Sequence, residues 1–192
     1  MRKLIVSEWV TLDGVMQAPG LTDEDTEGGF THGGWQAPYA DEVFMETVTA
    51  SVAASDAFLL GRKTYDIFAG YWPKATGELA ESINSVAKHV VSRTQDRLTW
   101  QNSTLIKGDV APEIAKLKDQ AGKNILVVGS GELVQSLMPY KLVDEYQLMV
   151  FPLTLGRGKR LFRDVGSKQA LTLLGSRMTT KGVLILNYKT TS

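Results

Sequence analysis

The chain has 192 residues and a mass of 21.0 kDa, the size of one domain with a substantial hydrophobic core. Hydrophobic residues make up 43% of it, charged residues 22%, and the mean hydropathy is -0.09, which excludes a disordered, collagen-like or coiled-coil chain. The 21 basic side chains balance the 21 acidic ones, so charge predicts neither a nucleic-acid nor a membrane partner. We expect a single domain over residues 1–192 that binds a small molecule.

The charges are divided unevenly along the chain. Residues 1–96 carry 7 basic and 14 acidic side chains, whereas residues 97–192 carry 14 basic and 7 acidic ones. The second half therefore leaves room for a local anion site.

The residue types that are missing narrow the chemistry further. The absence of Cys excludes disulfides, thiolate nucleophiles and Cys-ligated zinc, and suits a reducing compartment. The two histidines, His32 and His89, lack metal-site spacing, so we expect no metal. No apolar run reaches the ~20 residues that span a bilayer, and residues 4–6 are too short for the core of a signal peptide. These features predict a cytoplasmic protein.

The first half of the chain alternates between strand and helix patterns. A β-rich run over residues 4–12 ends at a turn, and the Gly-, Pro- and acid-rich residues 17–38 predict a long loop of the kind that is often functional. Helical spacing of apolar residues, with two acids in the first turn, predicts a helix over residues 41–55. Further segments follow in order: a strand at 57–60, a helix that starts at 64–68, a helix at 78–86 and a strand at 88–92.

The second half begins with a short strand at 104–106 and a helix opened by Pro112. Residues 124–128 are a continuous apolar run between two glycines, typical of a parallel strand that is buried on both faces. After a helix at 132–138, the segments 145–151, 171–176 and 183–188 predict strands without intervening helices. The fold class we expect is α/β, with a central, mostly parallel sheet, antiparallel C-terminal strands and helices on both faces.

Three turns follow predicted strands, at the edge where open α/β sheets bind ligands. Thr11-Leu12-Asp13-Gly14 is by itself best explained as a tight turn. Gly61-Arg62-Lys63-Thr64 is equally consistent with an anion site at a helix N-terminus and with a solvated basic turn. Gly129-Ser130-Gly131 would let a pyrophosphate approach the backbone, but it lacks the full dinucleotide fingerprint because position 134 is Val.

The order of these turns resembles the dihydrofolate reductase-like superfamily, most closely the reductase domain of the bifunctional riboflavin-biosynthesis deaminase/reductase and its stand-alone relatives. The resemblance covers nearly the whole chain. It rests on the three turns, on the strand end at residues 90–93, and on Asp144-Glu145 followed by the Pro, Leu-Gly, Gly and Leu-Phe positions between 152 and 162. Ser130 departs from the family pattern at the second phosphate turn. The deaminase half is absent, because its zinc site requires Cys.

The resemblance implies the dihydrofolate reductase-like fold and an NADPH-dependent reductase. Hydride chemistry belongs to such a cofactor, and the protein supplies orientation and charge neutralisation. Carried over to this sequence, Arg62 and Thr64 would hold the cofactor phosphates, and Ser92 and Arg93 would lie near the 2′-phosphate. The other implied cofactor-binding positions are Thr11, Met16, Gly61, Gly129, Ser130 and Gly131, with residues 9–16 along the nicotinamide.

The substrate side matches less closely. Trp35 belongs to a W-x-x-P segment that in folate reductases precedes the substrate helix, but Ala40 stands where those enzymes place a carboxylate, so we expect dihydrofolate to be a poor substrate. Asp41 is one residue displaced, which turns a helical side chain by about 100°, and we favour a first-turn charge over a catalytic role. Arg157 and the basic residues that follow it could bind a substrate phosphate, but we favour a solvated loop for them.

The leading hypothesis is a riboflavin-type reductase that acts on a ribosylaminopyrimidine-like or other small polar substrate. The alternatives are a dihydrofolate, ketone or quinone-like reductase that uses the same cofactor, and a non-catalytic nucleotide-binding protein. Asp13, Asp41 and Glu8 are the candidate proton donors, and sequence alone does not choose among them. Relatives of this type commonly pair, and the apolar C-terminal strands need a cover, so we expect a homodimer.

Overall fold

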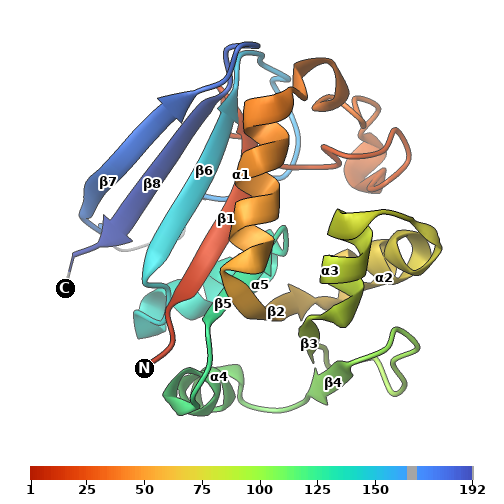
Figure 1. Cartoon of the computed structure of the whole chain (residues 1–192), viewed down its shortest axis with the longest axis vertical. Coiled ribbons are helices and arrows are strands. Elements are labelled where there is room, and N and C mark those ends of the chain that lie inside the picture. Colours follow the sequence, from red (N-terminus) through yellow and green to blue (C-terminus); the bar gives the residue numbers. More distant parts are fainter. Residues whose placement is uncertain (164–167, 192) are drawn as a thin grey trace.

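One mixed β-sheet organises the molecule (Figure 1). The structure, a computed structural model, describes residues 1–163 and 168–191, and within them eight strands are arranged in the order β4-β3-β2-β5-β1-β6-β8-β7. The strands from β4 to β6 pair in parallel, whereas β8 pairs antiparallel with both β6 and β7. This arrangement confirms the expected fold class. The strands are β1 (Leu4–Thr11), β2 (Ser55–Gly61), β3 (Ala87–Val91), β4 (Ser103–Ile106), β5 (Asn124–Val128), β6 (Glu145–Phe151), β7 (Leu171–Met178) and β8 (Leu184–Thr190).

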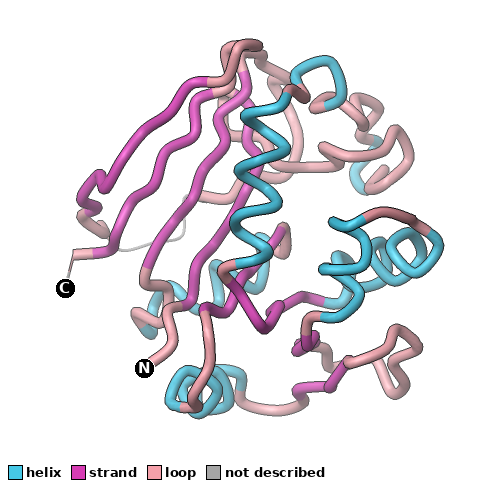
Figure 2. The backbone as a smooth tube through the Cα atoms, in the orientation of Figure 1, coloured by secondary structure: helices cyan, strands magenta, loops and turns pink. Residues whose placement is uncertain are grey.

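Helices cover both faces of the parallel part of the sheet (Figures 1 and 2). The α-helices are α1 (Glu42–Ala53), α2 (Arg62–Tyr71), α3 (Glu78–Ser85), α4 (Val110–Asp119) and α5 (Gly131–Leu137). Four 3-10 turns are η1 (Glu27–Gly29), η2 (Ala37–Tyr39), η3 (Trp72–Lys74) and η4 (Met138–Tyr140). The connection from β1 to β2 and that from β5 to β6 run in opposite directions across the sheet. Because such crossovers are right-handed, α1 and α5 lie on opposite faces. No helix in the described residues is long and apolar enough to span a membrane.

The buried residues explain why the central strands form. Leu4 and Val6 of β1, with Ile125 and Val127 of β5, belong to a cluster that packs against α4 and α5. Leu126 faces the other side and packs in a cluster with α1, α2 and α3. The continuous apolar run of β5 thus reflects burial on both faces, as its sequence predicted.

The predicted boundaries differ from the observed ones by a few residues, and one difference has a clear cause. Pro112 was expected to open its helix, but α4 already begins at Val110, which places Pro112 in its first turn. The first N–H groups of a helix have no intrahelical acceptor, so a residue without an N–H is tolerated there.

The strands β1 and β5 pair over only four residues. Their pairing ends at Ser7 and Val128, where β5 turns away into α5, while β1 continues along β6 as far as the pair Thr11 and Phe151. Beyond Ser7, one edge of β1 therefore has no strand partner on the β5 side. This separation opens the sheet at the carboxyl ends of its parallel strands.

We expect Leu59→Ala to destabilise the protein by about 2–5 kcal/mol, because Leu59 in β2 is fully buried and truncation would leave a cavity. Urea unfolding should show a lower midpoint with an unchanged slope. Leu12→Ala, at a side chain that is 69% exposed, is the matched control and should change stability by no more than about 0.5 kcal/mol. Equal losses in the two variants would contradict this account of the core.

Candidate functional site

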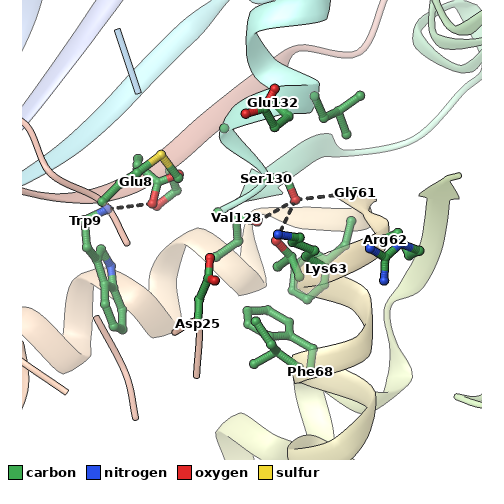
Figure 3. Close-up of a pocket in the computed structure, with 18 of the residues that line it drawn as sticks. Glu8, Trp9, Asp25, Gly61, Arg62, Lys63, Phe68, Val128, Ser130 and Glu132 are labelled. Carbon is green, nitrogen blue, oxygen red and sulfur yellow. Dashed lines mark hydrogen bonds between the residues drawn. The ribbon is translucent and has the colours of Figure 1, made fainter. Parts of the chain in front are cut away.

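A cavity of about 940 Å³ lies where β1 and β5 separate. Its volume is at the upper end of the range for small-molecule and cofactor sites, about 300–1,000 Å³. It is lined from the ends of β1, β2, β3 and β5, from the starts of α2 and α5, and from the long loop before α1 (Figure 3). The cavity therefore occupies the sheet edge at which α/β proteins bind ligands.

The start of α2 places polar groups on one wall. Gly61 is the N-cap of α2 and provides no side-chain cap, so the first amides of this helix are free of a capping group. Arg62 and Lys63 are exposed beside the cavity, and each also forms an ion pair, Arg62 with Asp66 at 2.9 Å and Lys63 with Glu27.

Ser130 joins the turn after β5 to the start of α2. Its Oγ accepts a hydrogen bond from the Gly61 N–H at 2.9 Å and lies 2.9 Å from Oγ1 of Thr64 (Figure 3). The backbone of Ser130 is left-handed, with φ of 62°, and Gly129 before it has φ of 59°. A Cβ at Gly129 would lie 3.2 Å from Oγ1 of Thr64, so this turn requires glycine for both its conformation and its close approach to α2.

The end of β3 contributes Ser92 and Arg93. The buried Ser92 hydroxyl accepts hydrogen bonds from the N–H groups of Thr94 and Gln95, at 3.2 and 3.0 Å, and thereby fixes the turn. The exposed Arg93 lines the cavity and has no ion-pair partner among the residues that the structure describes. It is therefore available to an anionic group.

Glu8 is the buried acid of the cavity. It is 3% exposed, and its Oε1 accepts a hydrogen bond from the Trp9 N–H at 3.2 Å, whereas Oε2 has no partner in the described residues. Burial raises the pKa of Glu8 to about 8; the Trp9 N–H opposes this shift, and the charge of Glu24 adds to it. Glu8 is thus a neutral carboxylic acid over most of the physiological pH range.

The long loop before α1 supplies two more acids. Oε2 of Glu24 accepts hydrogen bonds from the N–H groups of Gly20 and Leu21, at 2.7 and 2.8 Å, and burial raises the pKa of Glu24. Asp25 pairs with Lys159 at 2.5 Å. Both Glu24 and Asp25 line the cavity. The expectation that this loop contributes to a site therefore agrees with its position.

Thr11 and Asp13 do not line the cavity and instead build the turn after β1. Thr11 Oγ1 lies 2.5 Å from Asp13 Oδ1 and accepts a hydrogen bond from the Val15 N–H at 3.0 Å. Burial alone would raise the pKa of Asp13, but hydrogen bonds from Thr11, Gly156 and Leu155 outweigh burial and lower it. Asp13 is thus an ionised carboxylate with structural partners, which is unsuitable as a proton donor at neutral pH.

Asp41 also has structural partners. Its Oδ1 accepts a hydrogen bond from the Phe44 N–H at 2.9 Å, and this caps α1. Its Oδ2 accepts from the N–H and hydroxyl of Thr180, both at 2.7 Å. The hydrogen bond from the Thr180 hydroxyl is the largest cause of a pKa lowered to about 2. Asp41 is thus the N-cap of α1 and precedes its first turn, where Glu42 is the acidic residue, and its partners give it a structural role.

Trp35 and Arg157 lie outside the main cavity as well. The buried Trp35 donates from Nε1 to the Gln17 carbonyl at 2.8 Å and packs edge-to-face on Phe151, with ring centroids 5.1 Å apart. Arg157 donates to the Gly29 carbonyl at 2.8 Å and lines a second cavity of about 500 Å³. Trp35 of the W-x-x-P segment is thus a core residue, and its neighbour Gln36 is the residue that lines the main cavity.

The structure brings together most of the residues that the sequence singled out. Met16, Gly61, Arg62, Thr64, Ser92, Arg93, Gly129, Ser130 and Gly131 all line the cavity, whereas Thr11 does not. Sequence reasoning missed Glu24, Asp25 and Gln36 as lining residues, because positions inside an irregular loop carry no periodic signal. It also missed Phe44 of α1, whose helical spacing predicted burial and not a place in the cavity. The described residues contain no cluster of three or more His, Cys, Asp or Glu side chains that could hold a metal.

Comparison with known proteins identifies relatives over the whole length. The family model described as RibD C-terminal domain matches residues 2–185. The chain is 32% identical to the Bacillus subtilis (strain 168) protein YyaP, over 97% of this chain and 94% of that protein. It is 28% identical to YwjB from the same strain, over 95% of each chain.

Two solved structures have a similar fold. A putative riboflavin biosynthesis protein from Shewanella sp. PV-4 has a TM-score of 0.72 and 22% identity, with 99% of each chain covered. A pyrimidine reductase-like protein from Corynebacterium diphtheriae has a TM-score of 0.70 and 12% identity, over 100% of this chain and 92% of that one. At these identities the similarity establishes the fold.

The lowered pKa of Asp41 predicts a pH-dependent contribution to stability. Asp41 binds fewer protons in the folded state, so its ionic contribution is present above its ordinary pKa of 3.8 and is lost as the pH falls towards about 2. We expect Asp41→Asn, which keeps a capping oxygen, to lower the melting temperature at pH 6 and to approach the wild type near pH 2. A difference that is independent of pH would contradict an ionic role.

Proposed function

The chain belongs to the RibD C-terminal domain family, and from this premise we propose that it is an NADPH-dependent reductase that transfers a hydride to a small polar substrate. The observation that carries the proposal is that the turns after β2, β3 and β5 line one cavity of cofactor size. The phosphate half comprises residues 61–64, 92–93 and 129–131, and the substrate half comprises Glu8, Trp9, Glu24, Asp25, Gln36 and Phe44.

The groups of the phosphate half suit a dinucleotide pyrophosphate. The uncapped start of α2 offers backbone N–H groups and the positive end of the helix dipole. Arg62 and Thr64 add a guanidinium and a hydroxyl, which pair well with phosphate oxygens. Gly129 keeps the opposite turn free of a side chain. In this proposal these residues hold the cofactor phosphates.

Arg93 supports a preference for NADPH over NADH. It follows β3, lines the cavity and has no ion-pair partner in the described part of the chain, so a 2′-phosphate would provide the missing anion. The buried Ser92 hydroxyl fixes the turn that carries it. A guanidinium on a fixed turn loses little further freedom when it binds phosphate, which favours selectivity.

The bound cofactor would supply the hydride, and the chain would supply position and a dry environment. A riboflavin-type reductase is the reading that the family favours, and a dihydrofolate or other small-molecule reductase on the same fold is the second candidate. A non-catalytic nucleotide-binding protein is less consistent with the cavity, because Glu8 buries a carboxyl oxygen without a partner there. Burying a carboxyl oxygen without a hydrogen-bond partner lowers the stability of the protein, and the binding of a nucleotide alone does not require such a group.

We also propose that two copies of the chain associate through the end of the sheet that contains β7 and β8. Figure 1 shows no helix over these strands on the side facing the viewer. Leu173, Leu174 and Met178 of β7 and Leu184 of β8 are between 42% and 66% exposed. An edge strand with exposed apolar side chains favours pairing with a second copy.

We expect Arg93→Ala to weaken NADPH binding about 10- to 100-fold and NADH binding much less, because a charge-assisted hydrogen bond contributes ~1.5–3 kcal/mol and only NADPH carries the 2′-phosphate. Arg62→Ala should weaken the binding of both cofactors, because both carry the pyrophosphate. Calorimetric titration of each protein with both cofactors measures the difference. Lys116→Ala removes an exposed cation of α4 that pairs with Glu113 outside the cavity, and should change neither affinity. Equal losses for NADPH and NADH in Arg93→Ala, or no NADPH binding to the wild type, would overturn the cofactor assignment.

The proposed dimer predicts twice the 21.0 kDa mass of one chain by light scattering at micromolar concentration. A double variant, Leu174→Lys with Met178→Lys, should lower the measured mass towards that of one chain. In a two-fold dimer the introduced lysines of one chain would lie near those of the other, and their like charges would repel. A wild-type mass of 21.0 kDa that persists as the protein is concentrated would exclude the dimer.

A further inference from the structure

The position of Glu8 on β1 places its carboxyl group at the opening between the strands. Ser7 is the last residue of β1 that pairs with β5, so Glu8 is the first residue beyond that pairing. Because Ser7 pairs with Val128, Glu8 lies next to the end of β5, after which residues 129–131 of the phosphate half begin. Figure 3 shows its carboxyl group in this space, beside the Trp9 backbone N–H that it accepts from.

The charges around Glu8 favour its neutral form. The other charged residues that line the cavity are Glu24 and Asp25 from the loop, Arg62 and Lys63 from α2, Arg93 after β3, Asp109 before α4, Glu132 from α5, and Lys159 and Arg163 after β6. None of these cations forms an ion pair or a hydrogen bond with Glu8 in the described residues, and Glu24 adds a like charge. A protonated Oε2 would be a donor without an acceptor, which a ligand can provide.

The substrate half offers little to a phosphate. The cations that line the cavity outside the phosphate half are both paired: Lys159 with Asp25 and Glu27, both at 2.5 Å, and Arg163 with Glu132. The ionisable groups of the substrate half itself are acids, and Trp9 and Phe44 provide apolar surface. An anionic substrate would therefore meet repulsion and lose its hydration without a free cation in return.

We propose that Glu8 is the catalytic acid of this cavity and that its substrate is an uncharged carbonyl or imine compound, an inference that rests on the proposed function. Oε2 donates a hydrogen bond to the oxygen or nitrogen of the C=O or C=N bond. NADPH would supply the hydride to the carbon of this bond. The π electrons of the C=O or C=N bond then move to the oxygen or nitrogen, which takes the proton from Oε2. Glu8 is left as a carboxylate and regains a proton from water.

The test compares the wild type with Glu8→Gln, which keeps the size and a donor but has no proton to transfer. The probes are 1,2-naphthoquinone, its anionic 4-sulfonate and the uncharged imine 7,8-dihydrobiopterin, with NADPH consumption corrected for the reaction without protein. We expect the wild type to reduce at least one uncharged probe and to disfavour the sulfonate. Glu8→Gln should lower kcat about 100-fold or more and leave NADPH affinity within about twofold.

The pH dependence separates an acid from a merely structural residue. The wild-type kcat should fall as the pH rises through about 8, because the active form of Glu8 is protonated. Glu24→Gln removes the neighbouring like charge and should move this fall to lower pH. In the absence of any substrate, an infrared pH titration should show a protonated carboxyl band that is lost on the alkaline side and is missing in Glu8→Gln.

The outcomes distinguish this inference from the proposed function. Failure of the wild type to bind NADPH defeats the proposed function, whereas the infrared titration still reports on Glu8. If NADPH binds, two results overturn the assignment of Glu8 as the catalytic acid. One is a kcat of Glu8→Gln equal to that of the wild type, and the other is an infrared titration in which Glu8 is ionised at pH 6. The proposed substrate class is overturned if the enzyme reduces the sulfonate in preference to the uncharged quinone. It is also overturned if the enzyme reduces none of the three probes.

Discussion

The separation of β1 from β5 after Ser7 and Val128 is the constraint on which the site depends. Up to this pair the two strands share hydrogen bonds, and their side chains are held in the core between α4 and α5 on one face and α1 on the other. Beyond it, β5 must turn within one residue, and Gly129 makes the turn at a positive φ. The backbone edge of β1 and the start of α5 are then exposed to the same cavity.

The Ser130 hydroxyl keeps this opening in shape. It links the turn after β5 to the Gly61 N–H and to Thr64, so that the ends of two neighbouring strands are fixed relative to each other. The left-handed backbone of Ser130 costs of order 1 kcal/mol, and its hydrogen bonds offset that cost. The serine at position 130 therefore has a physical use, because glycine would remove the hydroxyl that bridges the two turns.

The parts of the molecule that the sequence predicts well are those governed by periodicity and by turns at strand ends. The apolar run of β5, the helix α1 and the basic turn at Arg62 and Lys63 lie where they were expected. Roles that depend on long-range partners were not accessible in the same way. Asp41 is fixed by Thr180, which is 139 residues away in the chain, and no local pattern reports such a contact.

Glu8 illustrates the same limit from the other side. In the sequence it is one polar residue in an alternating strand, where exposure is the usual expectation. The long loop contributes to the surroundings of Glu8, because Glu24 of this loop lines the same cavity and its charge adds to the raised pKa of Glu8. Trp35 anchors that loop by packing on Phe151 and by its hydrogen bond to the Gln17 carbonyl. A loop held by a core residue forms a fixed wall, so this side of the cavity that Glu8 lines is already shaped before any ligand binds.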